Sequence, residues 1–334
     1  MQIPRSDERR RNLIGGEWRP PSTGEHEPCL NPADTREVIG LWPRSGAADA
    51  KAAVDAAAKA FPDWSRTPGP ERGRIIGRAH QILKAKIDLL AEALCREEGK
   101  TLSESRGEVM KGLNLLEFYS GEGFRTHGKT LPSETRQSLM LTLRQPVGPV
   151  TLITPWNFPF AIPVWKTAPA LVAGCTVVLK PASLTPVCTH LLAEALVEAG
   201  LPPGVINVVT GPGGAIGNAL VDDPRIRAVS FTGSNSVGLK LYERAARRGI
   251  KVTCEMGGKN PVVVLDDADV DLAAAGILQG AFGSTGQRCT ATSRVVATPR
   301  IAPKLTEALV SGARSLKVIG KSRVGWSNLT RNTA

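Results

Sequence analysis

Two patterns of apolar residues divide the chain shortly before its midpoint. In the first part, apolar residues recur mainly at spacings of three and four, which predicts helices. The first helix is expected over Asp49–Phe61, where strong helix formers dominate and Pro62 should end it. The second is expected over residues 70–99, with Gly99 as its C-terminal cap, and the third over Leu102–Tyr119.

Beyond Pro146, short apolar runs alternate with segments of helical spacing. Strands are predicted over residues 147–155, 176–181, 205–211, 227–233, 252–256, 260–266 and 293–298. Continuous apolar strands joined by helices indicate a parallel sheet covered on both faces. The sequence therefore predicts the α/β fold class. Alternation over Ser138–Leu143 predicts a separate hairpin within residues 124–146.

Length and composition limit the class of protein. A chain of 334 residues is longer than one core usually supports, so we expect two domains, with a boundary near Gly257-Gly258. The longest nearly apolar stretch, Thr167–Leu179, is shorter than a membrane-spanning helix, so no membrane insertion is expected. The N-terminus resembles neither a secretory signal nor a transit peptide, and the predicted location is cytoplasmic.

The net charge of +11 raises the question of nucleic-acid binding. The excess lies mainly at the chain ends, in residues 1–19 and 300–334, and aromatic residues make up only 4%. Because little is present from which to build a stacking surface, nucleic-acid binding is not expected, and a basic nucleic-acid-binding protein is kept only as a competing class. The six cysteines form no C-x-x-C pair, so neither a disulfide framework nor a metal site is expected.

Five polar clusters carry the candidate chemistry. Four of them follow predicted strands, where open α/β sheets collect ligands, and they span Thr154–Pro159, Lys180–Ser183, Phe231–Gly238 and Glu255–Asn260. The fifth, Gly283–Cys289, follows a predicted helix. No G-x-G-x-x-G fingerprint follows the first strand of the sheet, so a dinucleotide would have to be held in another way.

Three side chains in these clusters are candidates for a nucleophile, a general base and an oxyanion donor. Cys289 lies beside Arg288, and positive charge favours the thiolate that attacks a carbonyl carbon. Glu255 ends a strand before two glycines, where a partly desolvated carboxylate suits a general base. Asn157 offers an amide donor for an oxyanion. Taken singly, each also fits an ordinary role: a small buried cysteine, an edge carboxylate and a capping asparagine.

Three further positions suit an anionic ligand. Gly233 allows close approach of the backbone, and Ser234 with the free N–H groups of a following helix can hold a phosphate. A helix cap is the commoner role for such a serine. Lys180 ends an apolar strand and can pair with a ribose hydroxyl or a phosphate, although a strand-end lysine is usually only solvated.

In this order and at these separations, the five clusters resemble the aldehyde dehydrogenase superfamily, from about Leu13 to about Val318. The resemblance implies that Cys289 is the nucleophile, that Glu255 activates the hydrolytic water and that Asn157 donates to the oxyanion. The adenosine ribose would meet Lys180 and Ser183, and the pyrophosphate would lie near Gly233 and Ser234. The full set of implied cofactor-binding residues is Thr154, Trp156, Lys180, Ser183, Gly233, Ser234 and Gly257.

The resemblance also implies a domain plan with an incomplete second α/β domain. Its parts are a dinucleotide-binding domain in residues 1–123 and 147–256, an oligomerisation hairpin in 124–146, the N-terminal part of a catalytic domain in 257–318, and an aberrant tail in 319–334. Family members continue much further and supply a Glu-x-Phe segment and an assembly strand. We therefore expect a truncated or frame-shifted chain with weak or absent activity alone. A homo-oligomer is implied, but its assembly strand is missing.

The implied reaction oxidises an aldehyde to a carboxylic acid through a thiohemiacetal and a thioester, with NADP or NAD as the cofactor. Ser183 stands where NAD-preferring relatives often have Glu, whose charge repels a 2′-phosphate, so NADP should be accepted. The segment around Cys289 is most similar to α-ketoglutaric semialdehyde (2,5-dioxovalerate) dehydrogenases, then to succinate semialdehyde dehydrogenases. Arg288 or Lys166 would meet the substrate's distal carboxylate. The alternative is a catalytically silent dinucleotide-binding fragment.

Overall fold

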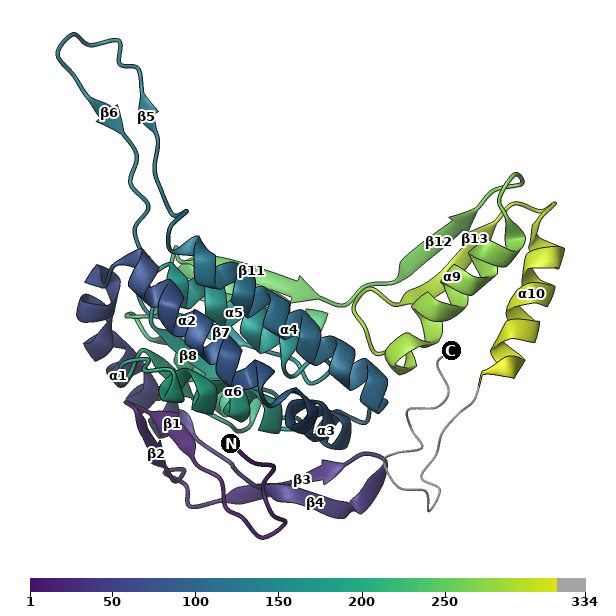
Figure 1. Cartoon of the computed structure of the whole chain (residues 1–334), viewed down its shortest axis with the longest axis horizontal. Helices are drawn as coiled ribbons and strands as arrows, with labels where there is room; N and C mark the ends of the chain where they lie inside the picture. Colours follow the sequence, from purple (N-terminus) through teal and green to yellow (C-terminus); the bar gives the residue numbers. More distant parts are fainter. Residues whose placement is uncertain (317–334) are drawn as a thin grey trace. The chain divides into compact units, whose positions relative to one another are not determined.

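The computed structural model describes residues 1–316, which fall into two compact units (Figure 1). The first unit comprises Met1–Gly99 and Ser105–Glu255, and the second comprises Lys100–Glu104 with the described residues from Met256 to Leu316. The short segment Lys100–Glu104, which the sequence places in the dinucleotide-binding domain, therefore groups with the second unit. The tail expected over residues 319–334 lies outside the described residues, as do residues 317 and 318.

A seven-stranded sheet forms the centre of the first unit, in the order β11-β10-β7-β8-β9-β1-β2. Its parallel part consists of β10 (Ala228–Gly233), β7 (Val150–Ile153), β8 (Val177–Lys180) and β9 (Ile206–Val208). Every residue of β7, β8 and β9 is buried, as expected for strands covered on both faces. The predicted parallel α/β sheet is confirmed, and β11 (Lys251–Met256) lies beside β10.

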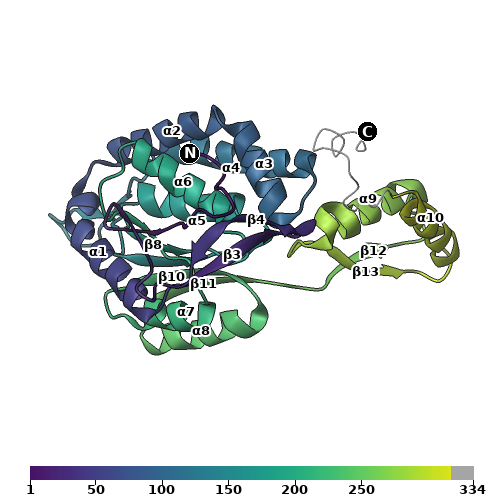
Figure 2. The ribbon, with the colours of Figure 1, turned by 90° about the horizontal axis from the view of Figure 1, so that it is seen from below.

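Helices cover both faces of this sheet (Figure 2). One face is packed by α1 (Ala47–Arg66), α7 (Gly213–Asp222) and α8 (Asn235–Arg247). The other is packed by α5 (Ala161–Val172) and α6 (Val187–Glu198). From β7 the chain moves through β8 to β9, and α7 then returns it to β10 on the other side of β7. The strand order reverses beside β7, which is where open α/β sheets bind ligands.

Two of the helix predictions need correction. Pro62 does not end α1, which continues to Arg66, and burial of the Trp64 side chain favours the last turn despite the hydrogen bond that proline removes. The helix expected over residues 70–99 is two helices, α2 (Gly69–Lys84) and α3 (Ile87–Glu98). Apolar spacing does not reveal the break, because core residues continue on both sides of it.

Some of the remaining elements were predicted correctly, and four strands were not predicted. Gly99 caps α3 with a φ of 89°, as predicted, and α4 (Leu102–Glu122) begins where expected. The predictions include no strand before residue 47, whereas the structure has four. These are β1 (Asn12–Ile14), β2 (Glu17–Arg19), β3 (His26–Asn31) and β4 (Asp34–Pro43). The first two are only three residues long, which is too short for a clear alternation.

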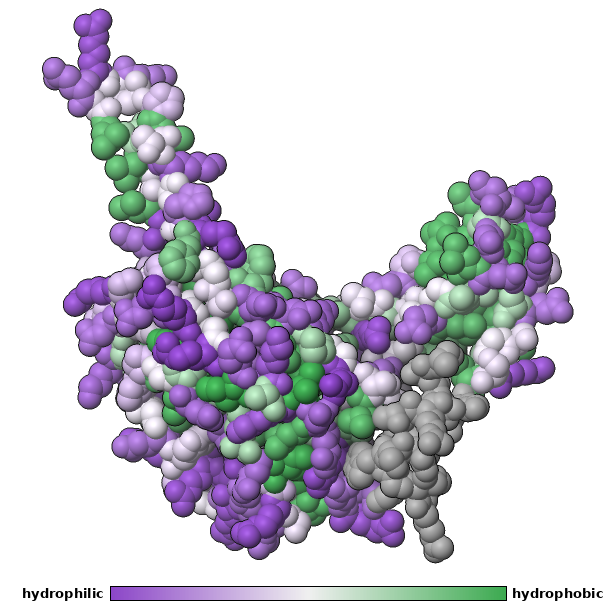
Figure 3. Space-filling model, viewed as in Figure 1, coloured by the Kyte–Doolittle hydropathy of each residue, from purple (hydrophilic) through white to green (hydrophobic). Residues whose placement is uncertain are grey.

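A hairpin arm projects from the helices of the first unit (Figure 1). It contains β5 (Thr130–Leu131) and β6 (Met140–Leu141), which pair antiparallel and confirm the predicted hairpin. Apolar side chains on this arm are open to solvent, and Figure 3 shows them gathered along it. The most exposed are Leu139 at 77% and Leu143 at 73%.

The second unit pairs two parallel strands with two helices. The strands are β12 (Asn260–Val264) and β13 (Thr292–Ala297), and the helices are α9 (Val270–Phe282) and α10 (Ala302–Ser315), the last of which the sequence analysis missed. Its small core consists of Val264, Val270, Ala274, Ile277, Ile301 and Leu305. Within residues 1–316, no helix is both long and apolar enough to cross a membrane.

Candidate functional site

Most of the predicted site residues lie at one edge of the first unit's sheet. Thr154, Trp156 and Asn157 follow β7, Lys180 and Ser183 lie at the end of β8, and Gly233 and Ser234 lie at the end of β10. Because these strands are parallel neighbours, their carboxyl ends lie side by side. Glu255 belongs to β11 of the same sheet. The remaining two predicted residues, Gly257 and Cys289, belong to the second unit.

Hydrogen bonds join the loops that follow β7 and β8. The Thr154 backbone N–H donates to the Lys180 carbonyl at 3.1 Å, and the Thr185 hydroxyl donates to the Trp156 carbonyl at 3.2 Å. The Thr154 side chain is buried, and its Oγ1 has no hydrogen-bond partner among the described residues. Such a hydroxyl is available to a polar ligand at this edge.

Lys180 is not the solvated strand-end lysine that its position in the sequence also allowed. The residue is only 5% exposed, and its Nζ donates to the Pro181 carbonyl at 2.9 Å. Burial penalises the ammonium and lowers the Lys180 pKa to about 8, although the charge of Glu27 partly opposes this effect. A cation held in this way is ready to meet an anionic or hydroxyl-bearing ligand.

The start of α8 lacks the side-chain cap that is the commoner role for a serine at this position. Ser234 occupies the N-cap position, with φ −73° and ψ 150°, but its side chain makes no capping hydrogen bond to the helix. The side chain is exposed, and its Oγ lies 3.4 Å from that of Ser236. The first N–H groups of α8 therefore have no side-chain cap. At Gly233, a Cβ atom would lie 2.6 Å from the Phe231 ring, so packing alone already requires glycine there.

Lys166 on α5 has an electrostatic role at this edge. Its Nζ donates to the Ser230 hydroxyl at 2.7 Å, and the residue is 7% exposed. Burial lowers the Lys166 pKa to about 8, while the charges of Glu255 and Cys254 favour the ammonium form. From the sequence, Lys166 was expected only as a partner of a substrate carboxylate. Its proximity to Glu255 has no signal in the sequence, because the two residues are far apart along the chain.

In the second unit, Cys289 ends a loop with an uncommon backbone. Ser284 and Thr285 have φ values of 51° and 55°, which non-glycine residues adopt only when surrounding contacts hold them. The Cys289 carbonyl accepts a hydrogen bond from Asn260 Nδ2 at 2.7 Å. Arg288 donates through Nε and Nη2 to the Ser284 hydroxyl, at 3.2 and 3.0 Å. The loop is therefore held from both ends.

The six cysteines differ in their surroundings, and all are free thiols. Cys289 is exposed, Cys254 is half-buried, and the other four are buried. Burial raises the pKa of the Cys29, Cys95, Cys175 and Cys254 thiols, with that of Cys95 reaching about 12. The role of a small buried apolar residue therefore suits the four buried cysteines but not Cys289. Among the described residues, no group of His, Cys, Asp and Glu could hold a metal ion.

A family model and individual relatives point to the same protein family. Residues 18–325 match the model of the aldehyde dehydrogenase family. The chain is 45% identical to an α-ketoglutaric semialdehyde dehydrogenase of Bacillus subtilis over 92% of its own length and 63% of the relative's. It is 39% identical to an NADP⁺ succinate-semialdehyde dehydrogenase of Escherichia coli, over 93% and 64%.

Solved structures agree with the sequence matches. A crystal structure of an NADP-dependent enzyme of E. coli has a TM-score of 0.91 and 39% identity, covering 95% of this chain and 66% of that one. An NAD-dependent aldehyde dehydrogenase of Sinorhizobium meliloti has a TM-score of 0.90 and 39% identity, over 94% and 63%. The chain thus spans less than two thirds of the length of the relatives it matches first. On its sequence and its fold, it belongs to the aldehyde dehydrogenase family.

Proposed function

We propose that this chain supplies the cofactor-binding edge and the nucleophile for the NAD(P)-dependent oxidation of an aldehyde to a carboxylic acid. The observation that carries the proposal is the exposure of Cys289. It is the exposed thiol among the six cysteines, its carbonyl accepts a hydrogen bond from Asn260, and it ends a loop in which hydrogen bonds also hold the left-handed residue Ser284. A cysteine nucleophile must be accessible and must be fixed in direction.

The edge of the first unit's sheet has the groups that a nicotinamide dinucleotide needs. Lys180 provides a buried cation, Thr154 Oγ1 a buried hydroxyl with no partner among the described residues, and the start of α8 a set of N–H groups without a side-chain cap. Phosphates and ribose hydroxyls bind such groups. We assign Thr154, Trp156, Lys180, Ser183, Gly233 and Ser234 to this role, and we also assign Gly257 of the second unit to cofactor binding. When bound, the nicotinamide ring accepts a hydride from the substrate carbon.

The chain's own residues then perform the remaining chemistry. Cys289 Sγ, as the thiolate, adds to the aldehyde carbon, and the new oxyanion accepts hydrogen bonds from the Asn157 amide and the Cys289 backbone N–H. Oxidation leaves a thioester on Cys289. Glu255 removes a proton from water, whose oxygen attacks the thioester carbonyl, and the Cys289 thiolate leaves as the carboxylic acid forms. Lys166 lies within electrostatic range of Glu255, whose charge favours the Lys166 ammonium form.

The proposed substrate is α-ketoglutaric semialdehyde, with succinate semialdehyde as the second candidate. The names of the B. subtilis and E. coli relatives support both. Both carry a distal carboxylate, for which Arg288 and Lys166 are the candidate cations, although each already donates to a serine hydroxyl. Rates across a panel of aldehydes with and without that carboxylate would rank the two. Equal rates for acidic and neutral aldehydes would contradict this assignment.

Thiol labelling and a single-turnover assay together test the reaction. We expect iodoacetamide at neutral pH to label Cys289 at least about tenfold faster than the other five cysteines. Cys289 is exposed to the reagent, whereas Cys254 is half-buried and the other four are buried. Because weak or absent activity is expected of the chain alone, the assay looks for a single turnover: mixing the chain with NADP⁺ and aldehyde should form a small amount of reduced cofactor without sustained turnover. Cys289→Ser should abolish this product, and Cys254→Ser should retain it. Cofactor binding without labelling or reduction would instead identify a silent dinucleotide-binding fragment.

Cofactor preference is tested at Ser183. Ser183→Glu should weaken NADP⁺ binding by about tenfold or more, because a carboxylate repels the 2′-phosphate, and should change NAD⁺ binding much less. Ser183→Ala is the matched control, since it adds no charge. Isothermal titration calorimetry measures the dissociation constants of NADP⁺ and NAD⁺. Turnover with NAD⁺ and none with NADP⁺ in the unchanged protein would contradict the proposal. The cytoplasmic location and the homo-oligomer stay predictions.

A further inference from the structure

Three glutamates in a twelve-residue stretch hold three of the loops that carry the proposed site. They are Glu97 at the end of α3, and Glu104 and Glu108 in the first turns of α4. Each carboxylate accepts hydrogen bonds from the backbone of a segment at least 52 residues away. None of the three belongs to the polar clusters that the sequence singled out.

Glu97 holds the start of α6. Its Oε2 accepts the Val187 N–H at 2.7 Å and its Oε1 accepts the Cys188 N–H at 2.9 Å. The residue is only 2% exposed. These two donors directly follow the loop after β8, which carries Lys180 and Ser183. The carboxylate therefore sets where that loop enters the helix.

Glu108 does the same for α5. Its Oε1 accepts the Phe160 N–H at 3.0 Å and the Ala161 N–H at 3.1 Å, and the residue is 4% exposed. Both donors directly follow the loop after β7, which carries Asn157. Neither α5 nor α6 has a side-chain cap from its own N-cap residue, so the glutamates replace the local caps that helices normally have.

Glu104 acts within the second unit, on the loop that leads to Cys289. Its Oε1 accepts the Ser284 N–H at 2.7 Å, and its Oε2 accepts from the Thr101 hydroxyl at 3.0 Å. Ser284 is 3% exposed and has a left-handed backbone, and its hydroxyl accepts from Arg288. The carboxylate thus fixes the strained turn from which Cys289 is displayed.

Burying the Glu97 and Glu108 carboxylates close to each other costs free energy. Buried anions lose hydration, and like charges repel, as the influence of Glu108 on Glu97 shows. Backbone N–H groups from the site loops and the positive ends of α5 and α6 offset that cost. A cap for a helix alone would need only a local Ser, Thr, Asp or Asn.

We propose that Glu97, Glu104 and Glu108 are positioning residues, each of which aligns one loop of the site through the backbone N–H groups of that loop. This inference rests on the proposed function. The test compares Glu97→Gln, Glu104→Gln and Glu108→Gln with Glu92→Gln, a control on α3 whose side chain is 49% exposed. An amide side chain cannot accept through both of its ends, so Glu97 and Glu104 each lose one acceptor.

The expected effects differ from one variant to the next. At about pH 8, Glu97→Gln should weaken NADP⁺ binding about fivefold or more and leave Cys289 alkylation unchanged. Glu104→Gln should change the Cys289 alkylation rate about threefold or more and leave NADP⁺ binding unchanged. Glu108→Gln keeps one oxygen acceptor but loses the charge that strengthens both hydrogen bonds, so it should lower the rate of cofactor reduction with little change in NADP⁺ binding. Glu92→Gln should match the unchanged protein in all three measurements.

Hydrogen exchange separates this proposal from the proposed function. In the unchanged protein the amides of Phe160, Ala161, Val187, Cys188 and Ser284 should be protected, although first-turn amides usually exchange freely. Fast exchange at these five amides would overturn the positioning role, even if a variant failed to fold. If the unchanged chain neither binds cofactor nor labels at Cys289, the proposed function fails. If it does both and all variants behave like Glu92→Gln, the positioning role fails alone.

Discussion

Burial lowers the pKa of two lysines in the first unit. Lys166 and Lys180 are both nearly inaccessible, and for both of them burial lowers the pKa to about 8. Each is held by a single oxygen acceptor, a serine hydroxyl for Lys166 and a backbone carbonyl for Lys180. The two lowered pKa values support the proposal that these lysines contact anionic groups of a ligand.

The buried carboxyl of Glu97 should make stability depend on pH. Burial raises the Glu97 pKa from 4.5 to about 7, despite the N–H groups that lower it. Between these values the folded protein holds a proton that the unfolded chain releases, so the free energy of unfolding should fall as pH rises through this window. Urea unfolding at several pH values measures the slope. Glu97→Gln should reduce it and Glu92→Gln should not, and an unchanged slope in Glu97→Gln would contradict this assignment.

Within single elements, two glycines of α4 predict opposite responses to the same substitution. A Cβ at Gly112 would lie 2.5 Å from the Phe160 ring, which is fully buried, whereas a Cβ at Gly107 meets nothing within 4 Å. Gly107→Ala should stabilise the protein by about 0.5–1 kcal/mol through helix propensity. Gly112→Ala should destabilise it by about 1–3 kcal/mol through overpacking. Thermal unfolding measures both, and two shifts of the same sign would contradict the packing argument.

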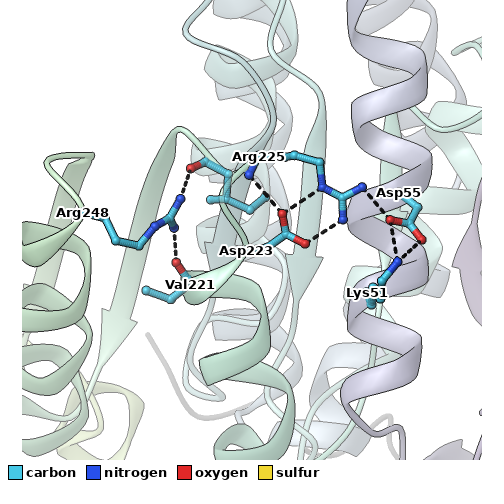
Figure 4. Close-up of polar contacts among 7 residues, drawn as sticks. Lys51, Asp55, Val221, Asp223, Arg225 and Arg248 are labelled. Carbon is cyan, nitrogen blue, oxygen red and sulfur yellow. Dashed lines mark hydrogen bonds and ion pairs between the residues drawn. The ribbon is translucent and has the colours of Figure 1, made fainter.

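A charged network joins α1 to the turn between α7 and β10 (Figure 4). Arg225 donates to both oxygens of Asp223, at 2.9 and 2.7 Å, and to Asp55 at 2.6 Å. Lys51 approaches the same Asp55 carboxylate at 3.0 Å. Hydrogen bonds from Lys51 and then Arg225 lower the pKa of Asp55, and those from Arg225 lower that of Asp223. The network is partly exposed, so its contribution is modest and sensitive to salt.

Arg225→Met should therefore lower the free energy of unfolding by about 1 kcal/mol at low salt and by less in high salt. The stabilisation depends on ionised aspartates whose folded-state pKa is lowered. It is present at neutral pH and is lost as pH falls through those lowered values. Denaturant unfolding at two salt concentrations tests this, with Arg19→Met, at the exposed pair with Glu17, as the control. Equal losses for the two variants would contradict a network.

At the scale of the whole molecule, we expect the exposed apolar surface of the hairpin arm to be where copies of the chain associate. The hairpin arm presents Leu139 and Leu143, each more than 70% exposed, and Figure 3 shows the apolar surface along this arm. Leu139→Ser combined with Leu143→Ser should shift an oligomer toward monomer without lowering stability, because neither side chain is packed in the folded chain. Sedimentation velocity measures the change, with Ser133→Ala in the same arm as the control. Unchanged sedimentation would contradict the role of the arm.

The sequence by itself was sufficient for the elements whose pattern is local. Apolar runs identified β7, β8 and β9, and Gly99 marked a helix end, because burial on both faces and a left-handed cap each leave a signal within a few residues. The clusters at strand ends also followed from local pattern, because strands that run parallel must end on one edge. Resemblance, rather than spacing, supplied the roles of Cys289, Glu255 and Asn157.

Only the tertiary structure decided which distant residues meet. Glu97, Glu104 and Glu108 look like ordinary helix surface in the sequence, yet they bind loops between 52 and 180 residues away. Lys180 could have been solvated, Pro62 should have ended α1, and the break before α3 has no apolar signature. In each case the deciding free energy comes from packing and desolvation against remote segments, which local propensity and periodicity do not contain.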